Sequence, residues 1–202
     1  GSGGLHLKRC GDAEIIDCVF SGNRAISTDS SYGSGALGGP VQNNGFPGYA
    51  RRTFFAGNES AARGGVMYAD AGTPTPWEFG FENCVFAGNS ATNLGGGALY
   101  LRDWSNEVVN CTFTGNDPSA IHVQGAAQTY RAVNCILWGD AAEVGTSAGN
   151  LEPVFCNIDQ LGFDGGEGNI QEDPLWAAEM SGTWTAATTF DVGSGQSMLT
   201  DA

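Results

Sequence analysis

A glycine-rich acidic segment near residue 165 carries the side chains best suited to bind a metal ion. It reads DQLGFDGGEGNIQED over residues 159–173, and its candidate ligands are Asp164, Glu167 and Asp173. Carboxylate oxygens on a flexible loop are what calcium takes, but this spacing matches neither an EF-hand nor the nonapeptide calcium repeat. We therefore expect either a solvated acidic turn, which the sequence favours, or a calcium site. Calcium is the one cofactor that the sequence raises.

Three aromatic residues, Tyr68, Tyr100 and His122, occupy the same position in copies of a repeated phrase, and they are the candidate ligand-binding residues. On the outer face of a sheet they would form a flat stripe suited to stacking on sugar rings. Outward strand positions also commonly carry such residues under a neighbouring loop. Both interpretations stay open, and the covered one is favoured.

No set of side chains forms a recognisable catalytic motif. A glycosidase needs two carboxylates facing one groove, and a polysaccharide lyase needs an acidic calcium cluster with a base beside it. Asp70, Asp103 and Glu107 are scattered, and with 22 acidic residues some will be neighbours by chance. We expect a protein that is not an enzyme, with lyase or glycosidase activity as the alternative.

Five of the six cysteines share one column of the repeat: Cys18, Cys84, Cys111, Cys135 and Cys156. Thr53 takes their place in the second copy, and Cys10 stands apart. Stacked, in-register cysteines point the same way, which disfavours the disulfide dihedral, and a buried free cysteine acts as a small hydrophobe. We expect a mostly reduced column, with one disulfide at either end as the alternative.

A phrase of the form Phe-x-Gly-Asn, followed by a glycine-led apolar strand, sets the organisation of the chain. It places Phe20, Phe55, Phe86 and Phe113 in one column, with Leu137 as the fifth member, at spacings of 35, 31, 27 and 24 residues. Asn23, Asn58, Asn89 and Asn116 form a second column, which Asp140 continues. Glycine before each asparagine suits a tight bend, and asparagine both tolerates a left-handed backbone and can bond to its neighbours in the stack.

The apolar positions alternate with period two and are rich in Val, Phe and Ile, which predicts strands. Cys84 and Phe86 should point inward and Val85 outward, while Leu99 and Leu101 point inward and Tyr100 outward. Two inward-facing strands per repeat, stacked about 4.8 Å apart, predict an all-β parallel solenoid of about six to seven coils. The preferred crossover hand makes it a right-handed parallel β-helix.

The phrases FSGN, FAGN and FTGN, with GGGAL and SGAL, resemble the repeats of chlamydial polymorphic outer-membrane proteins. The phrases NCILWGD and GFDGGEGNIQEDPLW resemble modules of large secreted planctomycete proteins. Together the resemblance covers roughly residues 3–176. It implies a right-handed β-helix in adhesion, surface architecture or sugar chemistry. We expect a β-helix over residues 1–176 and an irregular segment, or the start of another module, over 177–202.

The composition limits the classes of partner that the protein is expected to bind. The net charge of −14 and the single lysine argue against nucleic acid and anionic membranes, and no apolar run is long enough to span a bilayer. Both ends look excised from a longer chain. We expect a secreted or cell-surface bacterial module, structural or adhesive, that stacks axially on other copies or adjacent modules into a stalk or filament. The alternative is a module that binds or cleaves polysaccharide, with surface glycans as partners.

Overall fold

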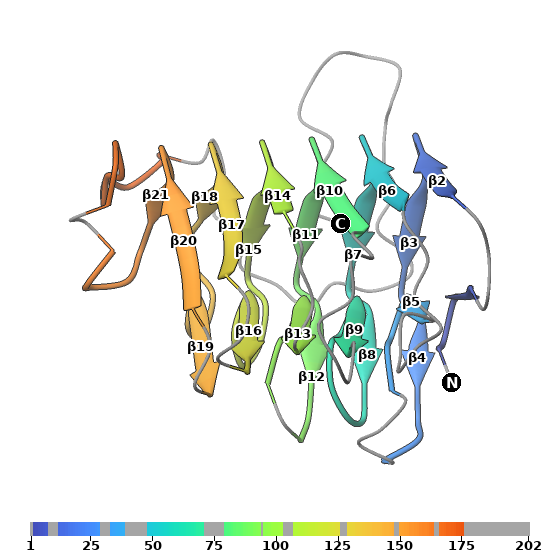
Figure 1. Ribbon diagram of the computed structural model, residues 1–202. Helices are drawn as coiled ribbons and strands as arrows, with labels where there is room; N and C mark the ends of the chain where they lie inside the picture. Colours follow the sequence, from blue (N-terminus) through green and yellow to red (C-terminus); the bar gives the residue numbers. More distant parts are fainter. Residues whose placement is uncertain are drawn as a thin grey trace.

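The chain folds into a parallel β-helix, in which short strands wind around one core and each coil lies on the last (Figure 1). The computed structural model describes residues 2–7, 12–28, 33–38, 48–70, 79–93, 95–102, 107–125, 129–147, 150–163 and 166–175. These residues contain strands and no helix. Residues 177–202, expected to be irregular or to begin another module, lie outside the described residues.

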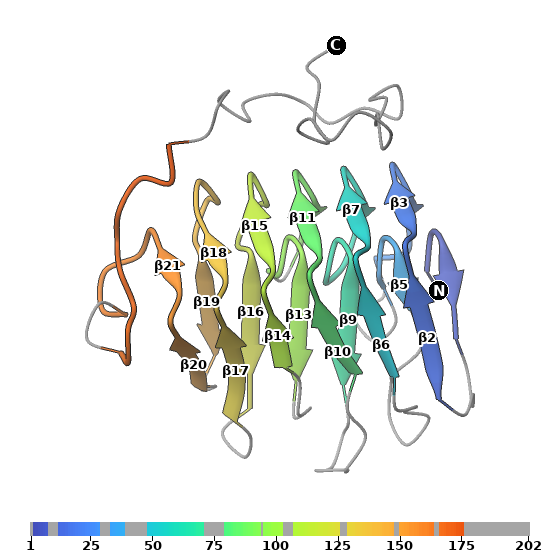
Figure 2. The same ribbon diagram turned by 90° about the horizontal axis from the view of Figure 1, so that it is seen from above.

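Three sheets of six strands and one short sheet line the helix, and every strand pair is parallel (Figures 1 and 2). Sheet I contains β1 (Leu5–His6), β5 (Leu37–Gly38), β9 (Met67–Asp70), β13 (Leu99–Arg102), β16 (Ile121–Gln124) and β19 (Val144–Ser147). Sheet II contains β2 (Ala13–Ile16), β6 (Gly48–Arg51), β10 (Phe79–Glu82), β14 (Glu107–Val109), β17 (Thr129–Val133) and β20 (Asn150–Val154). Sheet III contains β3 (Val19–Ser21), β7 (Phe54–Ala56), β11 (Val85–Ala87), β15 (Thr112–Thr114), β18 (Ile136–Leu137) and β21 (Asn157–Ile158). Sheet IV contains β4 (Arg24–Ala25), β8 (Glu59–Ser60) and β12 (Ser90–Ala91). The described strands make six coils, which begin at β1, β5, β9, β13, β16 and β19.

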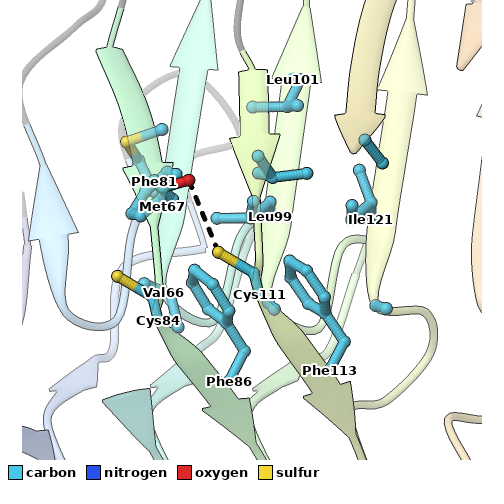
Figure 3. Close-up of a cluster of buried hydrophobic side chains, with 14 of the residues drawn as sticks. Val66, Met67, Phe81, Cys84, Phe86, Leu99, Leu101, Cys111, Phe113 and Ile121 are labelled. Atoms are coloured by element: carbon cyan, nitrogen blue, oxygen red, sulfur yellow. Dashed lines mark hydrogen bonds between the residues drawn. The ribbon is translucent and has the colours of Figure 1, made fainter. Parts of the chain in front are cut away.

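The register places like residues on top of one another, so the core is built from columns. Phe86 pairs with Phe55 on one side and with Phe113 on the other, and the Phe86 and Phe113 ring centroids lie 4.4 Å apart with the rings nearly parallel (Figure 3). Leu99 pairs with Met67 and with Ile121 in sheet I. All of these side chains are buried. The expected alternation of inward and outward residues along β11 and β13 is therefore correct.

Sheet II was not expected from the sequence, which indicated two inward-facing strands per coil. Its strands follow connections of different lengths and share no phrase, as the sequences AEII, GYAR, FGFE and EVV show. One inward column contains Ala50, Phe81 and Val108 in register, and Phe79 is buried as well, two residues before Phe81 and in register with Gly48. A residue as small as alanine alternates there with one as large as phenylalanine, so neither repetition nor side-chain size marks the strand.

Each of the first five coils bends at two left-handed positions, of which the sequence indicated one. The glycines of the Phe-x-Gly-Asn phrase have positive φ, for example 60° at Gly88, and the asparagines that follow them do not. A second left-handed column lies before the cysteines, at Asp17, Arg52, Asn83, Asn110, Asn134 and Phe155. Asparagine tolerates this backbone better than arginine or phenylalanine, so the column costs the most where Arg52 and Phe155 stand.

The asparagines instead form a one-way chain of hydrogen bonds along the helix axis. Asn58 donates from its backbone N and from Nδ2 to Asn89 Oδ1, at 3.0 and 2.9 Å, and Asn89 donates in the same way to Asn116. Asn89 Nδ2 also donates to the carbonyl oxygen of Phe55. Because buried polar groups are costly when left unpaired, this column fixes the register between coils.

The cysteine column is reduced: Cys18, Cys84, Cys111, Cys135 and Cys156 are all free thiols. Each thiol lies within hydrogen-bond distance of backbone carbonyl oxygens, as Cys111 does with Phe81 at 3.5 Å (Figure 3). Burial raises the pKa of the Cys111 thiol, which keeps it protonated at neutral pH. Asn169 Oδ1 accepts the Cys156 backbone N–H at 2.9 Å and so ends the column. Cys10 lies outside the described residues.

The asparagine column predicts a position-specific stability loss. Asn89→Ala removes the acceptor of two Asn58 donors inside the core, so unfolding should become easier by on the order of 3 kcal/mol. Asn93→Ala is the matched control, because the exposed Asn93 makes one bond, to the Ala61 carbonyl oxygen; its loss should stay within about 0.5 kcal/mol. Urea unfolding followed by circular dichroism measures both. Equal losses would show that the column does not stabilise the stack.

Candidate functional site

The outer face of sheet I carries the aromatic residues singled out in the sequence, and they do stack. Tyr100 is in register with Tyr68 on β9 and with His122 on β16. The Tyr100 and His122 rings are nearly parallel, with centroids 4.6 Å apart, whereas Tyr68 meets Tyr100 edge to face at 5.5 Å. Gly145 follows in the column, where a β-carbon would lie 2.7 Å from His122 Nδ1.

The stripe is not exposed, which agrees with the covered interpretation that the sequence favours and not with a sugar-stacking surface. Tyr68 is 1% exposed and Tyr100 2% exposed, and only His122 reaches partial exposure. The Arg63 guanidinium lies 5.3 Å from the centre of the Tyr68 ring and 4.9 Å from that of Tyr100. Cation–π attraction thus holds an arginine where a sugar would have to stack.

A hydrogen-bond network joins these rings to a buried carboxylate. The Tyr68 hydroxyl donates to Asp70 Oδ2 at 2.6 Å and accepts from Arg63 at 3.1 Å. Arg102, in register with Asp70 on the next coil, lies 3.4 Å from the same carboxylate oxygen. The Asp70 side chain is 4% exposed and that of Arg102 is 41% exposed. The carboxylate thus lies between Tyr68, two residues earlier on the same strand, and Arg102, on the next strand of sheet I.

Burial sets the titration of the aromatic groups. It raises the pKa of Tyr68 to about 12, with the Asp70 hydrogen bond as the second cause, and it raises the pKa of Tyr100 as well. It lowers the pKa of His122, to which the Arg63 charge also contributes. At neutral pH both hydroxyl groups are therefore protonated and the imidazole is neutral.

The chemistry open to this cluster is limited by its own contacts. Asp70 already accepts from Tyr68 and faces Arg102, so it is a poor general base in this arrangement. The Tyr100 hydroxyl donates to Gln124 Oε1 at 2.5 Å, which ties β13 to β16. The cluster joins three coils, and its more exposed part is the Arg102 guanidinium.

The acidic segment that suggested calcium is only partly described. Glu167 and Asp173 are both exposed, and Asp173 Oδ1 accepts the Leu175 N–H at 2.8 Å in a local turn. Asp164 lies outside the described residues. Across the described part of the chain, no three His, Cys, Asp or Glu residues are grouped so that they could hold a metal ion. Calcium therefore remains a proposal that no described geometry supports.

Sequence reasoning missed the polar half of the cluster. Asp70 had been treated as an isolated carboxylate, although it lies two residues after Tyr68 and therefore on the same face of β9. Its partner Arg102 stands two residues after Tyr100, so the repeat alignment could have found the pair. Arg63 lies in the bend before β9, outside any repeated phrase, and no sequence signal pointed to it.

Residues 1–137 match the family model described as the right-handed β-helix region. The chain belongs to the right-handed β-helix family. The β-helix is therefore right-handed, as expected from the sequence. The family includes enzymes, among them pectate lyase-like ones, as well as proteins that are not enzymes, so membership fits a structural or a polysaccharide-related module without choosing between them. No curated protein and no solved structure matches the chain. The described residues contain no α-helix long and apolar enough to cross a membrane.

The Tyr68–Asp70 contact predicts a measurable shift in tyrosine titration. Asp70→Asn removes the negative charge beside the hydroxyl, so the pKa of Tyr68 should fall but stay above its ordinary value, because burial is the larger cause. Absorbance of tyrosinate during alkaline titration measures it, with Tyr68→Phe identifying the signal. Glu107→Gln, at an exposed carboxylate in sheet II, is the control and should leave the curve unchanged. An unchanged titration in Asp70→Asn would contradict the network.

Proposed function

We propose that this β-helix is a non-enzymatic structural module of a bacterial extracellular or cell-surface protein, adhesive or stalk-forming, which stacks end to end on other copies or on adjacent modules. The resemblance of its repeats to chlamydial and planctomycete surface proteins supports the location. The apolar side chains exposed in its first and last coils support the assembly.

The observation that carries this proposal is where apolar side chains are exposed. In the described residues, every large exposed apolar side chain lies in the first coil or at and beyond the last one: Ile16, Val19, Ile26, Phe155, Leu161, Ile170 and Leu175. Exposed apolar groups that gather in one region mark contact surfaces. The Phe20 ring, which belongs to the core column, is also only partly buried. A neighbour along the axis would cover the Phe20 ring and would flank the outward side chains of the terminal coils, such as Val19, on the side where they have no described neighbour.

The sides of the helix, by contrast, use their charges to join coils. Five ion pairs of the described residues each connect adjacent coils: Arg24–Glu59 at 3.0 Å, Arg51–Glu82 at 2.6 Å, Arg52–Asp17 at 2.6 Å, Arg102–Asp70 at 3.4 Å and Arg131–Glu107 at 3.3 Å. Each exposed pair contributes only about 0–1 kcal/mol. These charges are already paired within the stack and join one coil to the next, which is consistent with a structural role for the sides of the β-helix.

Side-chain amides form hydrogen bonds with backbone groups of the last coil. Gln160 accepts the Val144 N–H at 2.8 Å and donates to the Val144 carbonyl oxygen at 3.2 Å, as a further strand would. Asn169 donates to the Pro153 carbonyl oxygen at 2.9 Å. Strand addition at these positions is therefore blocked, and the proposed contact at this end is one of apolar side chains.

End-to-end stacking predicts a complementation pattern in analytical ultracentrifugation. The chain should form oligomers that lengthen with concentration. Val19→Glu in the first coil, or Leu161→Glu after the last strand, should leave monomers, because each head-to-tail contact needs one face of each kind. An equal mixture of the two variants should form dimers and nothing longer, since one intact pair of faces remains. Thr92→Glu, exposed in the third coil, is the control and should assemble normally.

Other outcomes have defined meanings. A monomeric parent chain at all concentrations would overturn self-assembly. Dimers that either single variant still forms would place the contact on one end only. Loss of oligomers in a calcium chelator, restored by calcium, would assign a structural metal to the acidic segment.

A polysaccharide-binding or polysaccharide-cleaving module is the second candidate, and the Asp70 cluster favours it. Arg102 pairs with the Asp70 carboxylate there, and Arg63 lies over the Tyr68 and Tyr100 rings, so the cluster gathers two guanidinium groups on the surface of an acidic protein. Of the two, Arg102 is the one placed at the end of a strand, with its side chain 41% exposed.

Glycan-array binding tests this alternative. Binding that Arg102→Ala abolishes and Arg131→Ala preserves would support a glycan site at the cluster; both arginines are exposed to similar extents and each pairs with one carboxylate. Release of unsaturated or reducing sugars, abolished by Asp70→Asn, would establish an enzyme and overturn the structural proposal. We expect neither.

A further inference from the structure

The asparagine column ends at a carboxyl group, and this end is chemically different from the rest of the column. Asp140 Oδ1 accepts both the backbone N–H and the Nδ2 group of Asn116, the latter at 2.8 Å. It thus takes the acceptor role of an asparagine, but it has no amide with which to donate onward. The residue three positions after Ile158, where the next member would stand, is Leu161, which is 84% exposed.

A second carboxyl group is buried against the first. Glu143 is 1% exposed, and its Oε1 accepts the Asp140 backbone N–H at 3.2 Å. The remaining oxygens, Asp140 Oδ2 and Glu143 Oε2, are shielded from solvent and have no hydrogen-bond partner in the structure. Two buried carboxylate oxygens without a donor would cost several kcal/mol, so something must pair with them.

The surroundings favour a proton over a cation. No arginine, lysine or histidine of the described residues forms an ion pair with either carboxyl group. The charge that bears on the pair from another element is that of Asp159, which follows β21 and disfavours a charged Glu143. The other groups facing the pair are uncharged: the Asn116 amide, and the Gln160 amide bound to Val144. No third carboxylate completes a metal site among the described residues.

We propose that Asp140 and Glu143 share one proton, and that this shared proton is a pH-sensitive latch on the connection between β18 and β19. A protonated Asp140 donates from Oδ2 to Glu143, which satisfies both oxygens with one hydrogen. Asp140 keeps Oδ1 for Asn116, so the asparagine column stays complete.

The latch holds the residues that begin the last coil. Residues 140–143 lie on the preceding coils through three backbone bonds: Ala141 N–H to the Asn116 carbonyl, Ala120 N–H to that of Ala142, and Ile121 N–H to that of Glu143, at 2.9–3.2 Å. Deprotonation would leave two negative charges in contact inside this connection, with Asp159 beside them. Repulsion would loosen the last coil while the coils from β1 to β15 keep their own columns.

The sign of the pH dependence follows from the raised affinity for the proton. Burial, and then the hydrogen bond and charge of Glu143, raise the pKa of Asp140 to about 9, and burial raises the pKa of Glu143 too. In the unfolded chain both groups ionise at their ordinary values. The contribution of this pair to stability is therefore greatest in acid and is lost as pH rises from about 4 toward about 9.

The test is the pH dependence of unfolding in the full chain and in Asp140→Asn. The amide keeps the acceptor for Asn116 and donates to Glu143, so this variant replaces the shared proton with a fixed one. Between about pH 6 and pH 8 the unfolding constant of the parent should rise by about tenfold more per pH unit than that of the variant, which follows from one proton. Glu143→Gln should flatten the profile in the same way, and Asp17→Asn, an exposed carboxylate in the first coil, should not.

Carboxyl carbon chemical shifts from NMR give a second readout. One carboxyl signal of the parent should titrate above about pH 8 and be absent from Asp140→Asn. A loss of hydrogen-exchange protection at Ile121 at high pH, with the protection of Phe86 unchanged, should accompany it. Parallel pH profiles for parent and Asp140→Asn would overturn the latch. Calcium that restores the stability of the parent at high pH, and not that of Asp140→Asn, would also overturn it, by placing a cation between the two groups.

Discussion

Stacking in register at one strand spacing is the constraint on which the molecule depends. Coils about 4.8 Å apart give each side chain a neighbour at the same position of the next coil, so a residue that repeats along a column must interact well with copies of itself. Phenylalanine does so by stacking its rings, as Phe86 does on Phe113, and asparagine does so by donating and accepting at once. A charged residue cannot repeat in a column, and charges accordingly alternate in sign between coils, as in Arg51 and Glu82.

The same constraint divides the surface into two kinds. On the sides, outward residues find partners on adjacent coils, and the Asp70 cluster is such a set, with Tyr68, Arg102 and Gln124 contributed by three successive strands. The first and last described coils each have a described neighbour on one side only, and there apolar groups such as Val19 and Leu161 are exposed.

The part of the fold that could be predicted is the part that repeats. The Phe-x-Gly-Asn phrase gave the inward column of Phe55, Phe86 and Phe113 because each copy obeys the same packing and bend requirements. Sheet II was not predicted because residues in its inward column, such as Ala50 and Phe81, differ in size and follow no repeated phrase. The burial of Tyr68 and Tyr100 depends on Arg63, a residue outside the repeat, and alternation alone gives a direction and not an exposure. The carboxyl pair of Asp140 and Glu143 was equally invisible, since its proximity comes from a bend that no other coil shares.

The distance from each cysteine-column residue to its asparagine-column partner is the same in every coil: five residues from Thr53 to Asn58, from Cys84 to Asn89 and from Cys111 to Asn116. The remainder of the coil varies in length, from 30 residues between Asn23 and Thr53 to 16 between Asp140 and Cys156. The differences in coil length are therefore confined to one arc of the circumference. Because the corner from the cysteine column to the asparagine column has a constant length, the rest of each coil accommodates a longer or shorter loop without shifting the columns of the stack.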